Sequence, residues 1–167
     1  MTAAATINAG GRWTAAGARG LAPTAAWRTA DGTAIVSNTT LANEPVLFLT
    51  LPANTTWLFA LDILYKGNTA GSGDLKIGWS VPSGCTIRAR TDFADTSLIG
   101  RFGYITELLT QAMGSNGTSA PLGAGVRGTI FMGGTAGAVN LKVAQNTSNA
   151  TGTTILDGSI FSAWQVQ

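Results

Sequence analysis

Apolar and polar side chains alternate with a period of two along most of this chain, a pattern that predicts short β-strands rather than helices. The clearest example lies between positions 57 and 81, where two apolar runs flank a glycine-rich stretch. Their alternating apolar positions are Trp57, Phe59, Leu61, Ile63 and Tyr65, then Leu75, Ile77, Trp79 and Val81. We therefore expect two paired strands joined by a turn, which together form the floor of a β-sandwich.

The opposite face of the first run is also mostly apolar, with Leu58 and Leu64 on either side of a single charged residue, Asp62. This composition is typical of a strand that protein covers on both faces. We expect a further part of the protein or of a partner to cover the outer face. Because a buried carboxylate is costly unless it is paired, Asp62 is predicted to face a basic side chain or to lie at a subunit contact. The basic candidates are Arg88, Arg127 and Lys76.

Further strands are predicted at intervals of roughly 10 to 15 residues. Their ranges are 34–41, 46–51, 85–90, 102–109, 122–132, 138–145, 154–156 and 159–166. The range 102–109 overlaps a segment that also fits a helical turn, although we favour a strand. The ranges 122–132 and 138–145 flank a glycine-rich stretch and are predicted to form a hairpin. The fold class that follows is all-β, a jelly-roll β-sandwich of about eight or nine antiparallel strands.

Residues 1–32 consist largely of Ala, Gly and Thr with isolated large apolar residues, a composition that cannot build its own core. We therefore predict an extended N-terminal arm over 1–32 and a β domain over 33–167. Tryptophan is costly to leave in water, so the arm is expected to dock its tryptophans on a neighbouring subunit or on its own domain. Its predicted contacts are Arg12, Trp13, Arg19, Trp27 and Arg28.

The overall composition favours a protein whose surface is covered by partners. Only 11% of the residues are charged, and 22 are glycine, which suits strands joined by tight turns. The net charge is +2 without a cluster of lysines, so we do not expect a nucleic-acid partner. No apolar stretch is long enough to cross a membrane, and the first residues do not resemble a signal peptide. We expect synthesis in a cytoplasm and no membrane partner.

Candidate catalytic chemistry is sparse. The chain contains no histidine, which excludes a Ser-His-Asp triad and every histidine metal site. Cys85 is the single cysteine and has no base to activate it. A pair of carboxylates acting as acid and base remains possible. Asp92 and Asp95 are candidates for binding a cation, but they lie outside any calcium-loop pattern. We expect no enzymatic activity, no metal, no cofactor and no small-molecule substrate.

Several motifs resemble those of small structural proteins of tailed bacteriophages. They are L-D-I-L-Y-K-G, G-D-L-K-I-G-W-S-V-P-S-G, G-T-I-F-M, L-K-V-A-Q-N-T-S-N-A-T and G-S-I-F-S-A-W. The resemblance covers residues from about 40 to 167 and is strongest over 57–84 and 141–164. It implies a trimeric jelly roll of the TNF type that acts as a capsid decoration (cement) protein or as a minor tail protein. The family carries no catalytic residues.

The resemblance implies a homotrimer on the capsid surface of a virion, bound to the major capsid protein. Its predicted trimer contacts are Trp57, Leu58, Asp62, Leu64 and Phe161. The alternative is a receptor-binding or glycan-binding protein of the tail, which would use aromatic side chains in a loop between 92 and 117. These aromatic residues are Phe93, Phe102 and Tyr104, and the competing interpretation places them in the core.

Overall fold

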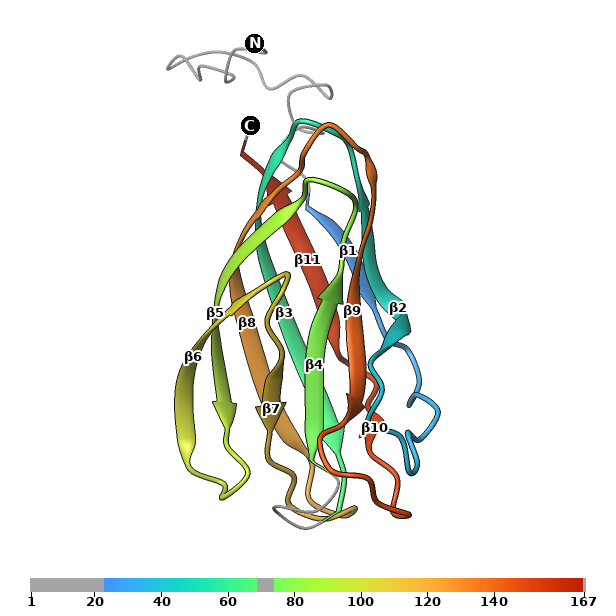
Figure 1. The fold of residues 1–167 in the computed structure, drawn as a ribbon. Coiled ribbons are helices and arrows are strands. Elements are labelled where there is room, and N and C mark those ends of the chain that lie inside the picture. The colour runs from blue at the N-terminus through green and yellow to red at the C-terminus, as the bar shows by residue number, and fades with distance from the viewer. Residues whose placement is uncertain (1–22, 69–73, 167) are drawn as a thin grey trace, which may run out of the picture.

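The computed structural model describes residues 23–68 and 74–166, which form a β-sandwich of two antiparallel sheets (Figure 1). The described residues hold eleven strands, so the predicted all-β sandwich is confirmed. The strands are β1 (Thr24–Trp27), β2 (Ala42–Leu51), β3 (Thr56–Lys66), β4 (Leu75–Ser80), β5 (Thr86–Ala94), β6 (Gly100–Thr106), β7 (Gln111–Met113), β8 (Leu122–Phe131), β9 (Gly137–Gln145), β10 (Thr154–Ile155) and β11 (Ile160–Gln165). Within these ranges the structure contains no helix that could span a membrane.

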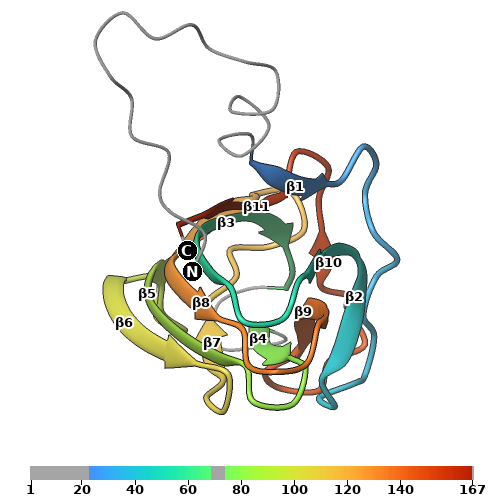
Figure 2. The same cartoon turned by 90° about the horizontal axis from the view of Figure 1, so that it is seen from above.

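Successive strands cross repeatedly from one sheet to the other (Figure 2). The larger sheet has the order β1-β11-β3-β8-β5-β6, with β10 also paired to β3, and the smaller sheet has the order β2-β9-β4-β7. The strands β1, β3, β8 and β11 therefore alternate along the chain with β2, β4, β7 and β9, while the β5–β6 hairpin widens the larger sheet. This order is compatible with the jelly-roll interpretation, which stays a prediction.

An aromatic cluster joins the two sheets at the centre of the core. The ring of Phe59 on β3 lies 5.7 Å from that of Trp79 on β4 and 5.8 Å from that of Phe161 on β11. Aromatic pairs at these separations add to the stabilisation that burial alone provides. The predicted inner faces of 57–65 and 75–81 are therefore correct, but their predicted pairing is wrong. β3 and β4 meet across the core because alternation fixes the face that a strand buries and not its neighbour.

The predicted hairpin of 122–132 with 138–145 is wrong for the same reason. β8 pairs with β3 and β5 in the larger sheet, whereas β9 pairs with β2 and β4 in the smaller one. The range 34–41 forms no strand and contributes a single bridge from Ile35 to Thr153. The strand predicted at 102–109 is confirmed as β6, and its helical alternative is excluded.

The described part of the predicted arm belongs to the sandwich. β1 pairs with β11, with Thr24 opposite Ala163, and so completes the outer hydrogen bonds of β11. Beyond β1, the amide of Gly32 donates to the carbonyl of Ile155 at 2.8 Å. The β domain therefore begins at β1 and not at residue 33. The rest of the predicted arm, residues 1–22, lies outside the described residues.

Candidate interaction surface

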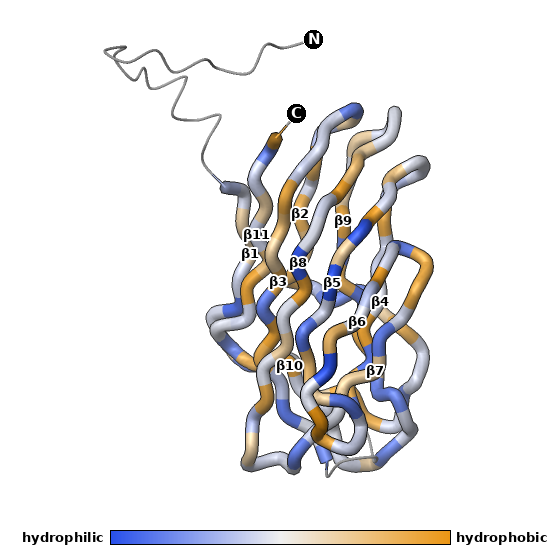
Figure 3. The backbone as a smooth tube through the Cα atoms, turned by 90° about the vertical axis from the view of Figure 1, so that its left-hand side faces the viewer, coloured by the Kyte–Doolittle hydropathy of each residue, from blue (hydrophilic) through white to orange (hydrophobic). Residues whose placement is uncertain are grey.

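The outer face of the larger sheet carries large apolar side chains at one end. This is the end at which β11 finishes (Figures 1 and 3). Leu58, Phe131 and Trp164 point outward from β3, β8 and β11 and are 50%, 40% and 41% exposed. Leu58 lies opposite Trp164 on one side and opposite Thr129 on the other, and Phe131 is two residues from Thr129. These three apolar side chains form what we call the apolar patch. Contiguous exposed apolar side chains of this kind mark interaction surfaces.

Charged residues occupy the middle of the same face. Arg127 Nη2 lies 3.5 Å from Asp62 Oδ1, and the two side chains are 55% and 50% exposed. The prediction that Asp62 faces a basic residue is therefore confirmed, with Arg127 as its partner. A pair this exposed contributes little to stability. Within one chain the outer face of β3 is open to solvent. The sequence predicts that protein covers this face, and none of the described residues does so.

The free edge of this sheet presents two aromatic rings to solvent. Phe102 and Tyr104 point outward from β6 and are 86% and 61% exposed, whereas Ile105 of the same strand points inward and is fully buried. In register, Phe102 lies beside Asp92 and Tyr104 beside Arg90 on β5. The interpretation of these two rings as core residues is therefore wrong.

A shallow hollow of about 330 Å³ lies over β8, between the neighbouring strands β3 and β5. Gly123 and Gly125 of β8 leave its floor without side chains, and we call it the glycine depression. Its walls include Asp62, Leu64, Asp92 and Arg127. Sequence reasoning missed this feature, although the signal was present as glycines at two alternate positions of one predicted strand.

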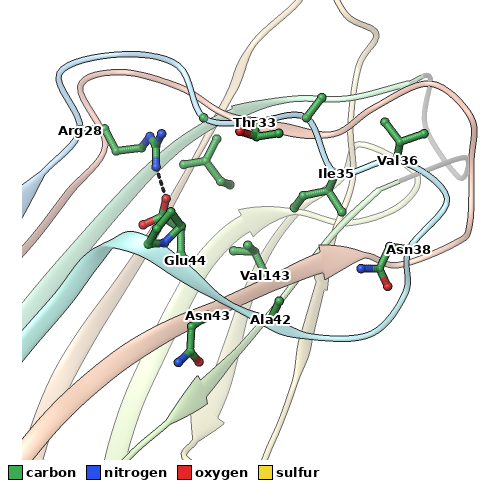
Figure 4. A pocket seen from close by; sticks show the side chains of 13 residues that line it. Arg28, Thr33, Ile35, Val36, Asn38, Ala42, Asn43, Glu44 and Val143 are labelled. Atoms are coloured by element: carbon green, nitrogen blue, oxygen red, sulfur yellow. Dashed lines mark hydrogen bonds and ion pairs between the residues drawn. The ribbon is translucent and has the colours of Figure 1, made fainter.

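A second hollow, of about 440 Å³, separates the segment 32–38 from β2 and β9 (Figure 4). At its edge Arg28 Nη1 donates to Glu44 Oε1, and these side chains are only 9% and 2% exposed. Glu44 Oε2 also accepts hydrogen bonds from the backbone amides of Val46, at 2.8 Å, and Leu47. This arrangement fastens the chain after β1 onto β2. Arg28 was predicted to contact a partner, but its side chain is buried in its own chain, where it binds Glu44, so that prediction is wrong.

The predicted contact residues are separated by the fold. Arg12, Trp13 and Arg19 lie outside the described residues, and Trp27 is exposed at the end of β1. Leu58, Asp62 and Leu64 lie on the outer face of the larger sheet. Trp57 and Phe161 point into the core and are buried within one chain, so their predicted contact with a second subunit is wrong.

The acidic side chains and the single cysteine are the groups among the described residues that bear on metal binding and nucleophilic chemistry. No group of three or more Cys, Asp or Glu side chains lies close enough there to hold a metal ion. Cys85 is buried, and burial together with the charge of Glu107 raises the pKa of its thiol to about 11. The thiol is therefore protonated at neutral pH and is a poor nucleophile. Burial also raises the pKa of Tyr65, whose hydroxyl donates to the carbonyl of Gly114 at 2.5 Å.

Comparisons with known proteins give only distant structural similarities. No family model matches the chain, and no curated protein sequence matches it significantly. One similar structure is the tripod (BppUct-A-L) from the baseplate of bacteriophage Tuc2009, with 15% identity and a TM-score of 0.35 over 98% of this chain and 75% of that chain. Another is infectious bursal disease virus Gt strain, with 8% identity and a TM-score of 0.24 over 87% of this chain and 42% of that chain. Similarities of this size identify neither the family nor the function of the chain.

Proposed function

We propose that this chain is a structural protein of a virus particle, a capsid decoration protein that binds the major capsid lattice as a homotrimer. The single structural observation that supports the proposal is the apolar patch, which is exposed on the sheet that the N-terminal strand joins. The motifs over residues 40–167 that resemble structural proteins of tailed bacteriophages support the same role. In this proposal the protein has no enzymatic activity.

The apolar patch has the composition expected of a subunit contact. Leu58, Phe131 and Trp164 keep roughly half of their surface in water in one chain, and full burial of such side chains is worth about 1.5 to 3 kcal/mol each. Arg88 lies over the ring of Phe131, with its Cζ 5.9 Å from the ring centre, and supplies a polar border. We assign the contact between copies to this patch, with Leu58 as the residue retained from the sequence prediction.

Strand β1 begins next to the apolar patch. Thr24 pairs with Ala163, which precedes Trp164 of the patch. Fully extended, residues 1–22 would reach at most about 75 Å. We propose that this segment crosses to neighbouring capsid subunits, where Trp13 is the apolar anchor and Arg12 and Arg19 pair with acidic groups.

A truncated chain tests this assignment. Deleting residues 1–22 leaves β1 and the apolar patch intact, so the variant is expected to keep its oligomeric mass in light scattering. It is also expected to lose sedimentation with capsids assembled from the major capsid protein. Undiminished capsid binding by the truncated trimer would show that the segment is not the tether. A full-length chain that never exceeds the mass of a monomer would contradict the trimer.

A second candidate function is receptor or glycan binding in the tail, and the exposure of Phe102 and Tyr104 favours it. The two roles differ in copy number and position. A decoration protein covers the head in many copies, whereas a tail protein is present in a few. Labelling intact particles with antibody-coated gold therefore separates them, because a signal confined to the tail contradicts the decoration role.

A further inference from the structure

Two glycines of β8 are not required by the fold. Gly123 and Gly125 occupy successive outward positions, and neither has a positive φ. A Cβ atom added at Gly125 would lie 3.6 Å from Asp62 Oδ1 and 3.9 Å from Asp92 Oδ2, and one at Gly123 would lie 3.7 Å from Leu64 Cδ2. These are ordinary van der Waals separations, so alanine fits at both positions.

Gly128, on the same strand, shows what a required glycine looks like. A Cβ atom there would lie 2.1 Å from the carbonyl oxygen of Arg88, a clash that only backbone movement could relieve. Glycine inside a strand lowers stability and often marks a bulge, a tight bend or a place that a ligand or another backbone approaches closely. The register of β8 with β3 is unbroken through Gly123 and Gly125, so no bulge accounts for them. We propose that the glycine depression is a binding site for a pyranose sugar of a glycan.

The walls of the depression match the hydroxyl groups of a sugar. The carboxylates of Asp62 and Asp92 flank Gly125, and the guanidinium of Arg127 lies beside Asp62. Hydroxyl groups both donate and accept hydrogen bonds, so one ring can use the carboxylates as acceptors and the guanidinium as a donor. Asp92 Oδ2 is the oxygen that faces Gly125, 3.9 Å from a Cβ atom added there, and it is therefore the acceptor nearest to a hydroxyl group in the depression, whereas Asp92 Oδ1 is enclosed by the protein.

The aromatic edge supplies the second half of sugar recognition. Phe102 lies beside Asp92 on the neighbouring strand, and Tyr104 follows on the same outward face. The apolar C–H face of a pyranose packs on an aromatic ring while its hydroxyl groups reach the polar wall. Neither ring lines the depression itself, and rings this exposed contribute little to the core, so they are free to contact a ligand that extends past Asp92.

Two other occupants fit less well. A calcium ion takes six to eight oxygen ligands, whereas the described residues place no three acidic side chains together. An extended peptide would pair with the free backbone edge of β6 and would not need a floor of glycines on β8. The sugar assignment names the ligand and the site of the second candidate function, glycan binding, and rests on that function.

Saturation-transfer NMR on the full chain tests the proposal. The probes are the methyl glycosides of glucose, galactose, mannose, rhamnose and N-acetylglucosamine at millimolar concentration. At least one glycoside is expected to receive saturation. Gly125→Ala and Phe102→Ala are each expected to weaken its binding by about tenfold. The matched controls are Gly134→Ala, where a Cβ meets nothing within 4 Å, and Phe48→Ala, which removes an exposed ring on the other sheet.

Thermal unfolding first establishes that the variants are folded. If no glycoside receives saturation, or if Gly125→Ala and Phe102→Ala bind as the parent chain does, the proposal is overturned. A change of molar mass in Gly125→Ala would also overturn it, because the depression would then be a contact between copies. These outcomes leave the capsid-binding test untouched, so the two assignments fail independently.

Discussion

Replacing Glu44 by alanine removes the partner of a buried charge. The guanidinium of Arg28 is 9% exposed and binds Glu44, which also accepts the amides of Val46 and Leu47. Breaking a buried pair by deleting one partner costs about 3 to 5 kcal/mol, because the other charge stays buried and unpaired. In a domain of this size, that loss lowers the melting temperature by roughly 10 °C.

Urea denaturation of the parent chain, Glu44→Ala, Arg28→Met and the double variant measures this coupling. The double variant is expected to be less destabilised than the sum of the single variants by about 1 kcal/mol or more, since neither charge is then left without a partner. Lys66→Met is the matched control, because the side chains of Lys66 and Asp31 form an ion pair that is partly exposed to solvent. Additive single effects would refute the view that the pair fastens the segment after β1 to β2.

Three further predictions concern the oligomer, the thiol and a packed glycine. Trp164→Ala is expected to weaken self-association by about tenfold without unfolding the chain, measured by light scattering across a dilution series, and an unchanged mass contradicts the patch assignment. The pKa of Cys85 is raised from 9.0 to about 11, so the native state keeps a proton that the unfolded chain releases. Stability should therefore fall as the pH rises from 9.0 towards about 11, and Cys85→Ala should make that fall shallower, while the part above pH 10.0 that comes from Tyr65 remains. Gly128→Ala is expected to cost about 2 kcal/mol or more in urea denaturation while Gly125→Ala costs little, and equal losses contradict the contact geometry.

Alternation predicted the buried faces of most strands correctly. On β5, Ile87 and Ala89 are buried while Arg88 is exposed, as a period of two requires. The neighbours of each strand could not be predicted, because an apolar face is satisfied equally by a paired strand or by the opposite sheet. That is why β3 and β4 were expected to pair although Phe59 and Trp79 meet across the core.

The candidate site was predictable only in part. Asp62 signalled a paired charge because a carboxylate interrupts an apolar strand, and Arg127 is its partner. The ion pair between Arg28 and Glu44 could not be predicted from the sequence, because it depends on how β1 and the segment after it pack against β2. The depression also depends on sheet order, because β8 must lie between β3 and β5 before Gly125 can separate two aspartates.

The two proposed contacts lie on one face without sharing residues. Leu58 of the apolar patch and Asp62 of the glycine depression are separated along β3 by about 13 Å. Effects of substitutions at sites this far apart add when the sites act independently. Trp164→Ala should therefore lower self-association and leave sugar binding unchanged. Gly125→Ala should weaken sugar binding and leave self-association unchanged. If Trp164→Ala also abolishes sugar binding, the depression is complete only in the oligomer, and a neighbouring copy supplies part of its wall.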